Sequence, residues 1–357
     1  MGLSLEEIDK RVQDSYELPN KVKEAVPTPM VTVRTSTFQH AEYIEKCIEG
    51  VLLQETDFPI EFIIGEDYST DGTRERVFKY AEQYSEVIRV ITADYNVGSK
   101  ANGRRCIEAS RGKYMAICEG DDYWTDPKKL QKQVDFLEAN ADYNICFHAV
   151  QILDKDGMLK DDDITEVPNE VTDINDLLEK GNFIHTPTVL FRNNLRKVPE
   201  ELLRAPYGDF FMHAINVEDK KIKYFPEVMA VYREGVGVWS SRSRNARVID
   251  TIRLYKLVCE YFEKNGNIDA CNLMINKRLR SIAGEIQEIS KQCKPDDLRK
   301  FLDGIYPDES IRSIERDISG LKKMYVSMAH RPEFLSAHAS VDVLIRALIL
   351  KVRKWFQ

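Results

Sequence analysis

Strand-like and helix-like segments alternate in a regular order along residues 30–153, and few folds accommodate such an order. Between the strand-like segments, apolar residues recur at helical spacing, as at Ile44, Ile48 and Val51. The alternation predicts crossover connections and therefore an α/β fold with a mostly parallel sheet and flanking helices. Ligands of such sheets bind beyond the carboxyl ends of the strands. The expected strands are Val31–Val33, Ile60–Ile64, Val87–Ile91, Lys113–Cys118 and Asn144–Leu153.

The rest of the chain is less regular. Strands are expected at Pro187–Phe191 and Tyr224–Tyr232, with one or two helical turns at Gly208–Asn216, and helices are expected from Arg244 onward. We therefore predict an N-terminal extension (1–27), one domain (28–243) and a C-terminal helical region (244–357). Within the domain, residues 28–153 form the first half and residues 154–243 the second.

Charge and cysteine spacing exclude some functions. The net charge of −8 argues against a general nucleic-acid binder, because phosphate backbones require a basic face. The seven cysteines lie singly, without a Cys-x-x-Cys pair, which suits a reducing cytosol. Neither a signal peptide nor a run of about 20 apolar residues is found, so a cytoplasmic protein is expected.

The first acidic cluster follows the second expected strand, where residues 66–73 read Glu-Asp-Tyr-Ser-Thr-Asp-Gly-Thr. A strand-to-helix turn capped by Ser69, Thr70 or Asp71 explains the small polar residues. It does not explain the two carboxylates of Glu66 and Asp67, because like charges repel unless a cation or hydrogen-bond donors are bound.

A second acidic cluster follows the fourth expected strand, where residues 119–124 read Glu-Gly-Asp-Asp-Tyr-Trp. Grouped carboxylate oxygens suit Mg²⁺ or Mn²⁺, which also bind phosphate oxygens. Gly120 would let the backbone approach a ligand closely. The alternative is an acidic surface turn ahead of a helix that begins at Pro127.

The two clusters, their order and their spacing resemble the family 2 glycosyltransferases of the A-type (GT-A), Rossmann-like nucleotide-diphospho-sugar transferase fold. The opening motif of that family corresponds to Ser-Thr-Phe-Gln at residues 36–39, and its acidic turn corresponds to residues 66–73. Its Asn-x-Gly loop is Asn-Val-Gly at 96–98, and its Asp-x-Asp metal motif is Glu-Gly-Asp at 119–121, with Asp122 adjoining. The resemblance is strong over residues 28–150 and can be followed to about residue 243.

The resemblance implies a role for each matching position on the donor side. Ser36 and Phe38 would line the base pocket, with Phe38 stacking on the nucleobase, and Asp67 would accept a hydrogen bond from the base. Asp121 would face the ribose or the metal, and Asp122 would bind the Mg²⁺ or Mn²⁺ ion that bridges the diphosphate. That ion would stabilise the charge on the leaving group.

The chain departs from the family pattern in three places. Glu66 and Glu119 stand where Asp is usual, and Phe38 lacks the phenol of the usual Tyr. The Arg-Asn pair that follows the Asn-x-Gly loop in the family has no counterpart in register. Lys100 and Arg104 are the candidate donor-binding cations in its place, with Arg105 nearby; each is equally readable as a solvated helix charge.

Inverting transfer requires a general base near the acceptor hydroxyl. In the family a Glu-Asp or Gly-Asp element downstream of the metal motif supplies it, and Asp209 in Gly-Asp-Phe-Phe at 208–211 is the match. An N-cap role for Asp209 is the alternative. His185 and the Tyr232-Arg233 pair are further acceptor-side candidates, and Trp239, in a Gly/Ser-rich loop, would stack on the donor sugar.

A basic, apolar helix ending in Trp355-Phe356 is expected at residues 341–356. Such a helix can lie on an anionic membrane surface, which would suit a lipid-linked acceptor. Docking on the protein itself or on a second subunit remains the alternative.

The sequence thus predicts a metal-dependent, inverting, hexosyltransferase-type glycosyltransferase of polysaccharide or glycan biosynthesis. Its donor would be a nucleotide-sugar, with a UDP-sugar expected first, and its acceptor a carbohydrate or a lipid-linked sugar. A degenerate, non-catalytic sugar-nucleotide-binding or scaffold protein is one alternative. A sugar-phosphate nucleotidyltransferase is another, although residues 34–40 lack the Gly-rich loop that it would need.

Overall fold

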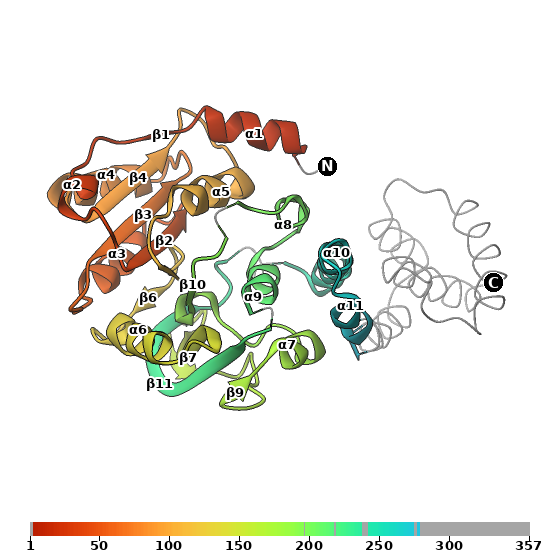
Figure 1. The fold of residues 1–357 in the computed structure, drawn as a ribbon. Helices are drawn as coiled ribbons and strands as arrows, with labels where there is room; N and C mark the ends of the chain where they lie inside the picture. Colours follow the sequence, from red (N-terminus) through yellow and green to blue (C-terminus); the bar gives the residue numbers. More distant parts are fainter. Residues whose placement is uncertain (1–2, 196, 218, 238–241, 275–276, 279–357) are drawn as a thin grey trace, which may run out of the picture. The chain divides into compact units, whose positions relative to one another are not determined.

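The computed structural model describes residues 3–195, 197–217, 219–237, 242–274 and 277–278 (Figure 1). The chain divides into two compact units. The first unit comprises Met1–Ile174, Asn182–Arg204 and Met212–Ser241, and the second comprises Asn175–Gly181, Ala205–Phe211 and the residues from Arg242 onward. Trp239 and the expected helix at 341–356 lie outside the described residues.

Eleven strands of the described residues form one sheet, which belongs to the first unit. Nine strands lie in the order β1-β4-β3-β2-β5-β10-β7-β11-β6, while β8 pairs with β7 and β9 with β11. The strands are β1 (Tyr16–Glu17), β2 (Val31–Thr37), β3 (Ile60–Glu66), β4 (Ile88–Thr92), β5 (Tyr114–Ile117), β6 (Tyr123–Trp124), β7 (Tyr143–Leu153), β8 (Leu159–Asp161), β9 (Val171–Thr172), β10 (Leu190–Arg192) and β11 (Lys221–Arg233).

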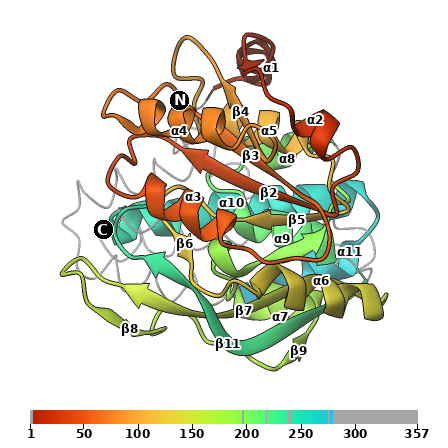
Figure 2. The ribbon, with the colours of Figure 1, turned by 90° about the vertical axis from the view of Figure 1, so that its left-hand side faces the viewer.

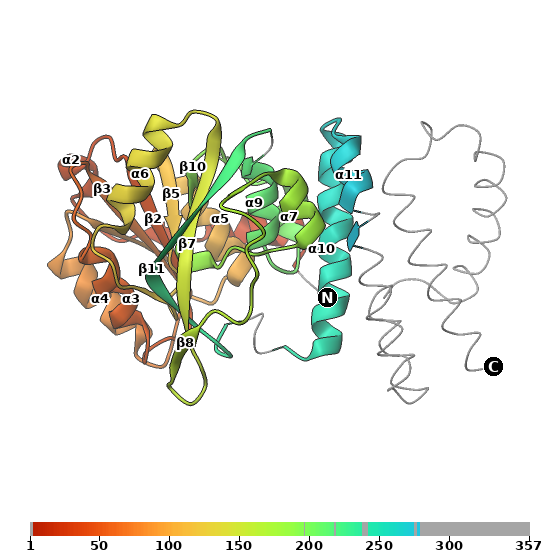
Figure 3. The same cartoon turned by 90° about the horizontal axis from the view of Figure 1, so that it is seen from below.

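The parallel core of this sheet confirms the predicted α/β fold. Strands β4, β3, β2 and β5 run parallel to one another, and β7 and β11 form a second parallel pair, which Figure 3 shows side by side. The short strand β10 lies antiparallel between β5 and β7. The strand expected at Pro187–Phe191 is wrong at its start, because Thr186–Thr188 forms a 3-10 turn and β10 begins only at Leu190.

Helices cover both faces of the parallel core (Figures 1 and 2). On one face lie α3 (Ile44–Leu52), α4 (Thr73–Gln83) and α6 (Lys129–Ala139), whose apolar side chains pack with alternate strand residues such as Val31 and Val33. On the other face lies α5 (Ser99–Ala109), where Cys106 packs against Ile63 and Ile91. This two-sided burial explains why the strands read as continuous apolar runs.

The N-terminal residues form structure of their own. Helix α1 (Leu5–Gln13) begins at a capping box made by Ser4 and Glu7, and β1 then pairs with β4 at the edge of the sheet. A short helix, α2 (Val22–Ala25), precedes β2. Within the first unit, residues 3–27 therefore contribute two helices and one edge strand to the sheet domain.

Helices make up the described part of the second unit. Its long helix α10 (Arg244–Lys264) begins at Ser243, whose hydroxyl accepts the N–H of Ala246, and α11 (Ile268–Met274) follows. The remaining described helices of the chain are α7 (Ile174–Lys180), α8 (Glu200–Arg204) and α9 (Asp209–Val217). Among the described residues, no helix is long and apolar enough to span a bilayer.

Candidate functional site

Both acidic clusters flank the carboxyl end of β2. Asp67 donates its backbone N–H to the carbonyl oxygen of Thr37 at 3.1 Å, and Gly120 donates its own to the carbonyl oxygen of Ser36 at 3.1 Å. The sheet order places β2 between β3 and β5, so the two turns that follow these strands meet at one edge. This is the edge at which ligands bind in parallel sheets.

The carboxylate of Glu66 is fully buried, and protein donors surround it. It accepts the N–H of Ser69 at 2.7 Å, that of Tyr68 at 3.2 Å and the hydroxyl of Thr92 at 3.0 Å, and it pairs with the Arg74 guanidinium at 2.7 Å. Glu66 therefore organises the turn after β3. Its extra methylene relative to Asp lets one side chain reach both its own turn and β4.

Asp67 holds the loop that precedes α5. Its two carboxylate oxygens accept the N–H groups of Val97 at 2.7 Å and Gly98 at 3.0 Å, and its backbone oxygen accepts the Asn96 amide at 3.0 Å. Burial raises the pKa of Asp67, while these two N–H groups act in the opposite direction. Each carboxylate oxygen retains a second lone pair, so contact with a base N–H remains chemically possible.

The end of the first cluster makes the expected helix start. Asp71 accepts the N–H and the hydroxyl of Thr73, at 3.0 and 2.6 Å, and also the N–H of Ala41 at 2.9 Å. The prediction that Ser69, Thr70 or Asp71 is the N-cap is wrong, because the N-cap of α4 is Gly72; Asp71 stands one residue earlier and accepts the N–H of the first helical residue. The turn at 69–73 is also tied to the segment that follows β2.

In the second cluster, Glu119 is engaged by the protein. It forms an ion pair with Arg34 of β2 and accepts the N–H of Ser36 at 2.9 Å. Gly120 comes next, and a Cβ there would lie 2.7 Å from both His40 Nδ1 and Thr37 Oγ1. The glycine thus gives room to neighbouring side chains of the protein.

Asp121 and Asp122 have different surroundings. Both side chains are buried, with Asp122 only 3% exposed. Asp122 Oδ1 accepts the N–H of Arg233 at 2.8 Å, and the Arg233 side chain donates to the backbone oxygen of Asp121 at 2.8 Å. Burial raises the pKa of both carboxyls, and for Asp122 the neighbouring charge of Asp121 raises it further. A pair of this kind is stabilised by a bound cation.

Arg233 lies against two aromatic rings. Its guanidinium carbon is 4.5 Å from the ring centre of Tyr43 and 5.6 Å from that of Tyr123. These contacts fix the end of β11 over the turn that carries Asp121 and Asp122. The Tyr232-Arg233 pair was predicted on the acceptor side, and the structure places Arg233 beside the acidic pair.

The side chains at the end of β5 fit a divalent metal ion bound together with phosphates. Because Glu119 is engaged by Arg34, two carboxylates, those of Asp121 and Asp122, are left for an ion. Mg²⁺ is commonly held by one or two carboxylates together with substrate phosphates. Among the described residues, no group of three or more His, Cys, Asp or Glu side chains has a metal-binding arrangement.

The remaining donor-side candidates lie in two places. Ser36 lies one residue before the end of β2. Phe38 follows β2 and is 45% exposed, so its ring is accessible to a base. Lys100 lies in the first turn of α5. Arg104 pairs with Asp9 on α1 and with Glu108 one turn further along α5. These ion pairs connect Arg104 to the N-terminal helix.

Asp209 is the first residue of α9 and belongs to the second unit. Its neighbours in the sequence make contacts within that unit. The ring centres of Phe210 and Tyr255 lie 5.6 Å apart, and the hydroxyls of Tyr207 and Thr251 lie 2.9 Å apart. Asp209 is the first residue within the helix, and both its role as a general base and its role as an N-cap stay predictions.

His185 has a partner that the sequence did not reveal. Its Nε2 lies 2.9 Å from a carboxylate oxygen of Asp162, and its ring centre lies 4.8 Å from that of Tyr232. The imidazole, the Thr165 hydroxyl and the Ile164 N–H lower the pKa of Asp162 against the effect of burial. The Gly-containing acidic loop after β7 was the only sequence signal, and it identified no single carboxylate.

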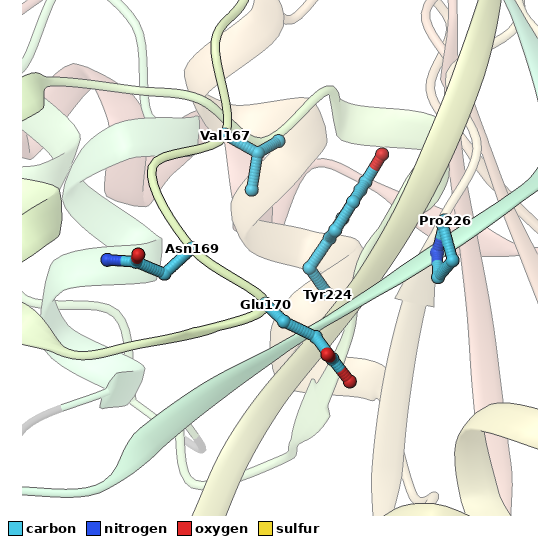
Figure 4. Close-up of a pocket in the computed structure, with 5 residues that line it drawn as sticks. All are labelled: Val167, Asn169, Glu170, Tyr224 and Pro226. Atoms are coloured by element: carbon cyan, nitrogen blue, oxygen red, sulfur yellow. The ribbon is translucent and has the colours of Figure 1, made fainter.

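A separate cavity of about 330 Å³ lies in the first unit (Figure 4). Val167, Asn169 and Glu170 line it from the segment before β9, and Tyr224 and Pro226 line it from β11. None of these residues belongs to the acidic clusters, so the cavity and the strand-end site are different features of the unit.

Residues 32–199 match the glycosyl transferase family 2. An uncharacterized protein of Mycobacterium tuberculosis is 35% identical over 220 residues, which are 61% of this chain and 62% of that protein. An uncharacterized glycosyltransferase of Methanocaldococcus jannaschii is 28% identical over 57% of this chain and 71% of its own length. The chain thus spans less than two thirds of the mycobacterial relative.

Solved structures share the fold. Residues 1–349 of TarS from S. aureus, in a complex with UDP, align with a TM-score of 0.57 and 15% sequence identity, over 91% of each chain. At this identity the likeness concerns the fold, and it agrees with the predicted GT-A architecture.

Proposed function

Because residues 32–199 match the glycosyl transferase family 2, we propose that the protein transfers a sugar from a nucleotide-diphospho-sugar to an acceptor hydroxyl. The observation that carries the proposal is the buried pair Asp121 and Asp122 at the carboxyl end of β5. Burial raises the pKa of both carboxyls, so the ionised pair needs a cationic partner. The metal ion of a metal-bound diphosphate would be that cationic partner.

Asp121 and Asp122 would hold Mg²⁺ or Mn²⁺, which would supply positive charge to the departing diphosphate. The N–H of Arg233 keeps one Asp122 oxygen in place, so the carboxylate is oriented before a ligand arrives. Such preorganisation lowers the cost of reordering during the reaction.

The donor base would lie beside Ser36 and stack on the exposed ring of Phe38, with Asp67 accepting a base N–H. Lys100 and Arg104 are the proposed cations for the donor, and Arg104 would have to leave its ion pairs with Asp9 and Glu108 to serve. Trp239, outside the described residues, is the proposed contact to the sugar. UDP is the first nucleotide to test, because the structurally similar TarS was solved with UDP.

Inverting transfer would proceed with Asp209 as general base. Its carboxylate would take the proton of the acceptor hydroxyl while the acceptor oxygen attacks the anomeric carbon and the bond to the diphosphate breaks. The acceptor would be a carbohydrate or a lipid-linked sugar, in polysaccharide or glycan biosynthesis. A cytoplasmic location, with membrane contact through residues 341–356, completes the proposal; the free, buried thiols of the six described cysteines fit a reducing compartment.

A non-catalytic sugar-nucleotide-binding protein is the second candidate. The engagement of Glu119 by Arg34 favours it, because the first carboxylate of the metal motif is neutralised within the protein. The two candidates differ in turnover, so hydrolysis or transfer of the sugar in the presence of metal separates them.

Calorimetric titration of UDP and GDP, with and without Mn²⁺, tests the proposal. We expect one nucleotide to bind in a metal-dependent manner and Asp122→Ala to weaken that binding at least roughly tenfold, as loss of a metal-orienting group typically does. Asp142→Ala is the matched control, because Asp142 is an exposed carboxylate paired with Lys221 away from the site. Equal binding by Asp122→Ala and the wild type, or no binding of either nucleotide, would contradict it.

A further inference from the structure

The N-terminal segment (residues 3–17) packs on the loop that joins β4 to α5 (residues 94–98). The Arg11 guanidinium, in the last turn of α1, donates to the carbonyl oxygens of Val97 at 3.1 Å and Asn96 at 3.4 Å. Two phenols add further bonds, since Tyr16 donates to Asp94 at 2.9 Å and Tyr95 donates to Asp14 at 2.7 Å. Arg11 thus donates two of the four hydrogen bonds named here between the segment and the loop.

Arg11 and Asp67 hold the same two peptide groups from opposite ends. Arg11 binds the carbonyl oxygens of the Asn96–Val97 and Val97–Gly98 peptides, and the Asp67 carboxylate accepts the N–H groups of both. A positive charge at the oxygen polarises a peptide group and strengthens its N–H as a donor. Arg11 therefore strengthens the hydrogen bonds that fix the Asp67 carboxylate.

Gly98 permits this close arrangement. Its φ of +85° is one that residues with a side chain rarely adopt. A Cβ at this position would lie 3.6 Å from Leu3 and 3.8 Å from the Arg11 guanidinium, so the N-terminal segment is in van der Waals range of the loop. The loop is enclosed by Asp67 on one side and by α1 on the other.

One ion pair and one hydrogen bond hold the N-terminal segment in this position. Asp9 pairs with Arg104 of α5, and Ser15 accepts a hydrogen bond from Arg105 at 2.9 Å. The same Arg105 donates to the backbone oxygen of Glu66, the residue before Asp67. The N-terminal segment is thus connected to the first acidic turn both through the loop and through α5.

We propose that the N-terminal segment is a positioning element of the donor site, in which Arg11 acts through the β4–α5 loop to hold the Asp67 carboxylate for the nucleobase. The inference rests on the proposed function, which assigns the base contact to Asp67. Arg11 is a positioning residue, because its guanidinium donates to the loop. The expected consequence is that Arg11 affects affinity for the donor and leaves the chemical step unchanged.

Arg11→Ala tests this role, and Lys10→Ala is the matched control. Lys10 is the exposed neighbour on the same helix, so its replacement removes the same charge and leaves the loop contacts in place. We expect Arg11→Ala to raise the dissociation constant of the nucleotide roughly tenfold, about 1.4 kcal/mol. In turnover assays the KM for the donor should rise, while kcat and the KM for the acceptor should stay at their wild-type values. Arg11→Lys, which retains one cationic donor, should recover part of the affinity.

Hydrogen exchange of the Val97 and Gly98 amides separates this inference from the proposed function. Exchange measures local opening of the loop and requires no nucleotide. Faster exchange in Arg11→Ala than in Lys10→Ala supports the positioning role, even if the wild type were to bind neither UDP nor GDP and the proposed function failed. Unchanged exchange, or wild-type donor affinity in Arg11→Ala, would overturn it.

Discussion

Glu66 ends β3 and Asp67 follows it, while Asp121 and Asp122 follow β5, so the two carboxylate pairs lie beyond two strands that flank β2 on either side. In the first pair the protein supplies the partners, since Arg74 and backbone N–H groups neutralise Glu66 and the loop amides hold Asp67. In the second pair, one backbone N–H reaches Asp122, and burial raises the pKa of both carboxyls. Similar strings of acidic residues thus serve a structural turn in one case and suit an external cation in the other.

The largest effect expected from this comparison is on stability. Glu66→Ala removes the buried partner of Arg74 and of two backbone N–H groups, so we expect it to lower the free energy of unfolding by about 3–5 kcal/mol. Asp122→Asn should leave the free energy of unfolding equal or slightly higher. Burial disfavours the charged carboxylate of Asp122, and the amide of Asn carries no charge. Urea unfolding of the full chain measures both changes.

Glu45→Ala serves as the control for this experiment, because the exposed pair of Glu45 with Arg76 should contribute at most about 1 kcal/mol. If Asp122→Asn destabilised the chain as much as Glu66→Ala, the two clusters would have the same structural role and the comparison would fail.

The second effect is a pH dependence. A carboxyl whose pKa is higher in the folded than in the unfolded chain stabilises the fold below the unfolded pKa, and this contribution is lost as pH rises through the folded pKa. Asp121 and Asp122 should therefore lower stability from roughly pH 4 upward, by about 1.4 kcal/mol for each pKa unit of difference.

Thermal unfolding of the wild type and of Asp122→Asn across this pH range isolates the contribution of the acidic pair, because titrating groups away from the pair contribute equally to both proteins. The difference between the two proteins should grow with pH, and Mn²⁺ together with the bound nucleotide should reduce it. A difference that stayed constant with pH would mean that the acidic pair is not perturbed.

The smallest effect concerns the end of the first cluster. Asp71→Ala removes the acceptor for the first N–H of α4 and for Ala41, and we expect a loss of about 1 kcal/mol, typical of helix-start contacts. Asp71→Asn, which keeps an oxygen acceptor, should lose less. Nucleotide affinity measured alongside should stay at the wild-type level in both variants; a large loss would extend the donor site into this turn.

Local sequence patterns were sufficient to predict the parallel core and both acidic turns. The strands are buried on two sides and therefore read as apolar runs. The acidic clusters follow two of those runs directly. In a parallel sheet the carboxyl ends of the strands share one edge, so the two clusters lie at the same edge. The contact of Asp71 with the first N–H of α4 is also a local interaction, and the sequence predicted a strand-to-helix turn at this place.

Contacts between distant segments were beyond such reasoning. Arg34 neutralises Glu119 from 85 residues away, and the Asp162 partner of His185 lies 23 residues away in an irregular loop. The N-terminal residues were predicted to be an extension. In the structure α1 buries one apolar residue, Ile8, and polar contacts join it to the rest of the unit. Polar contacts across a tertiary interface leave no periodic pattern in a sequence.

The hydrogen bond from Arg233 to Asp122 joins residues 111 positions apart, and it has a consequence for how the chain becomes active during synthesis. Contacts of such long range form after local ones, since the intervening chain must first be ordered. The ribosome therefore releases the first acidic turn, its loop and the N-terminal helix well before the second turn receives its closing strand. A nascent chain halted before residue 233 would contain Asp67 and its loop without the hydrogen bond that orients Asp122, so the proposed donor site would be completed late in translation.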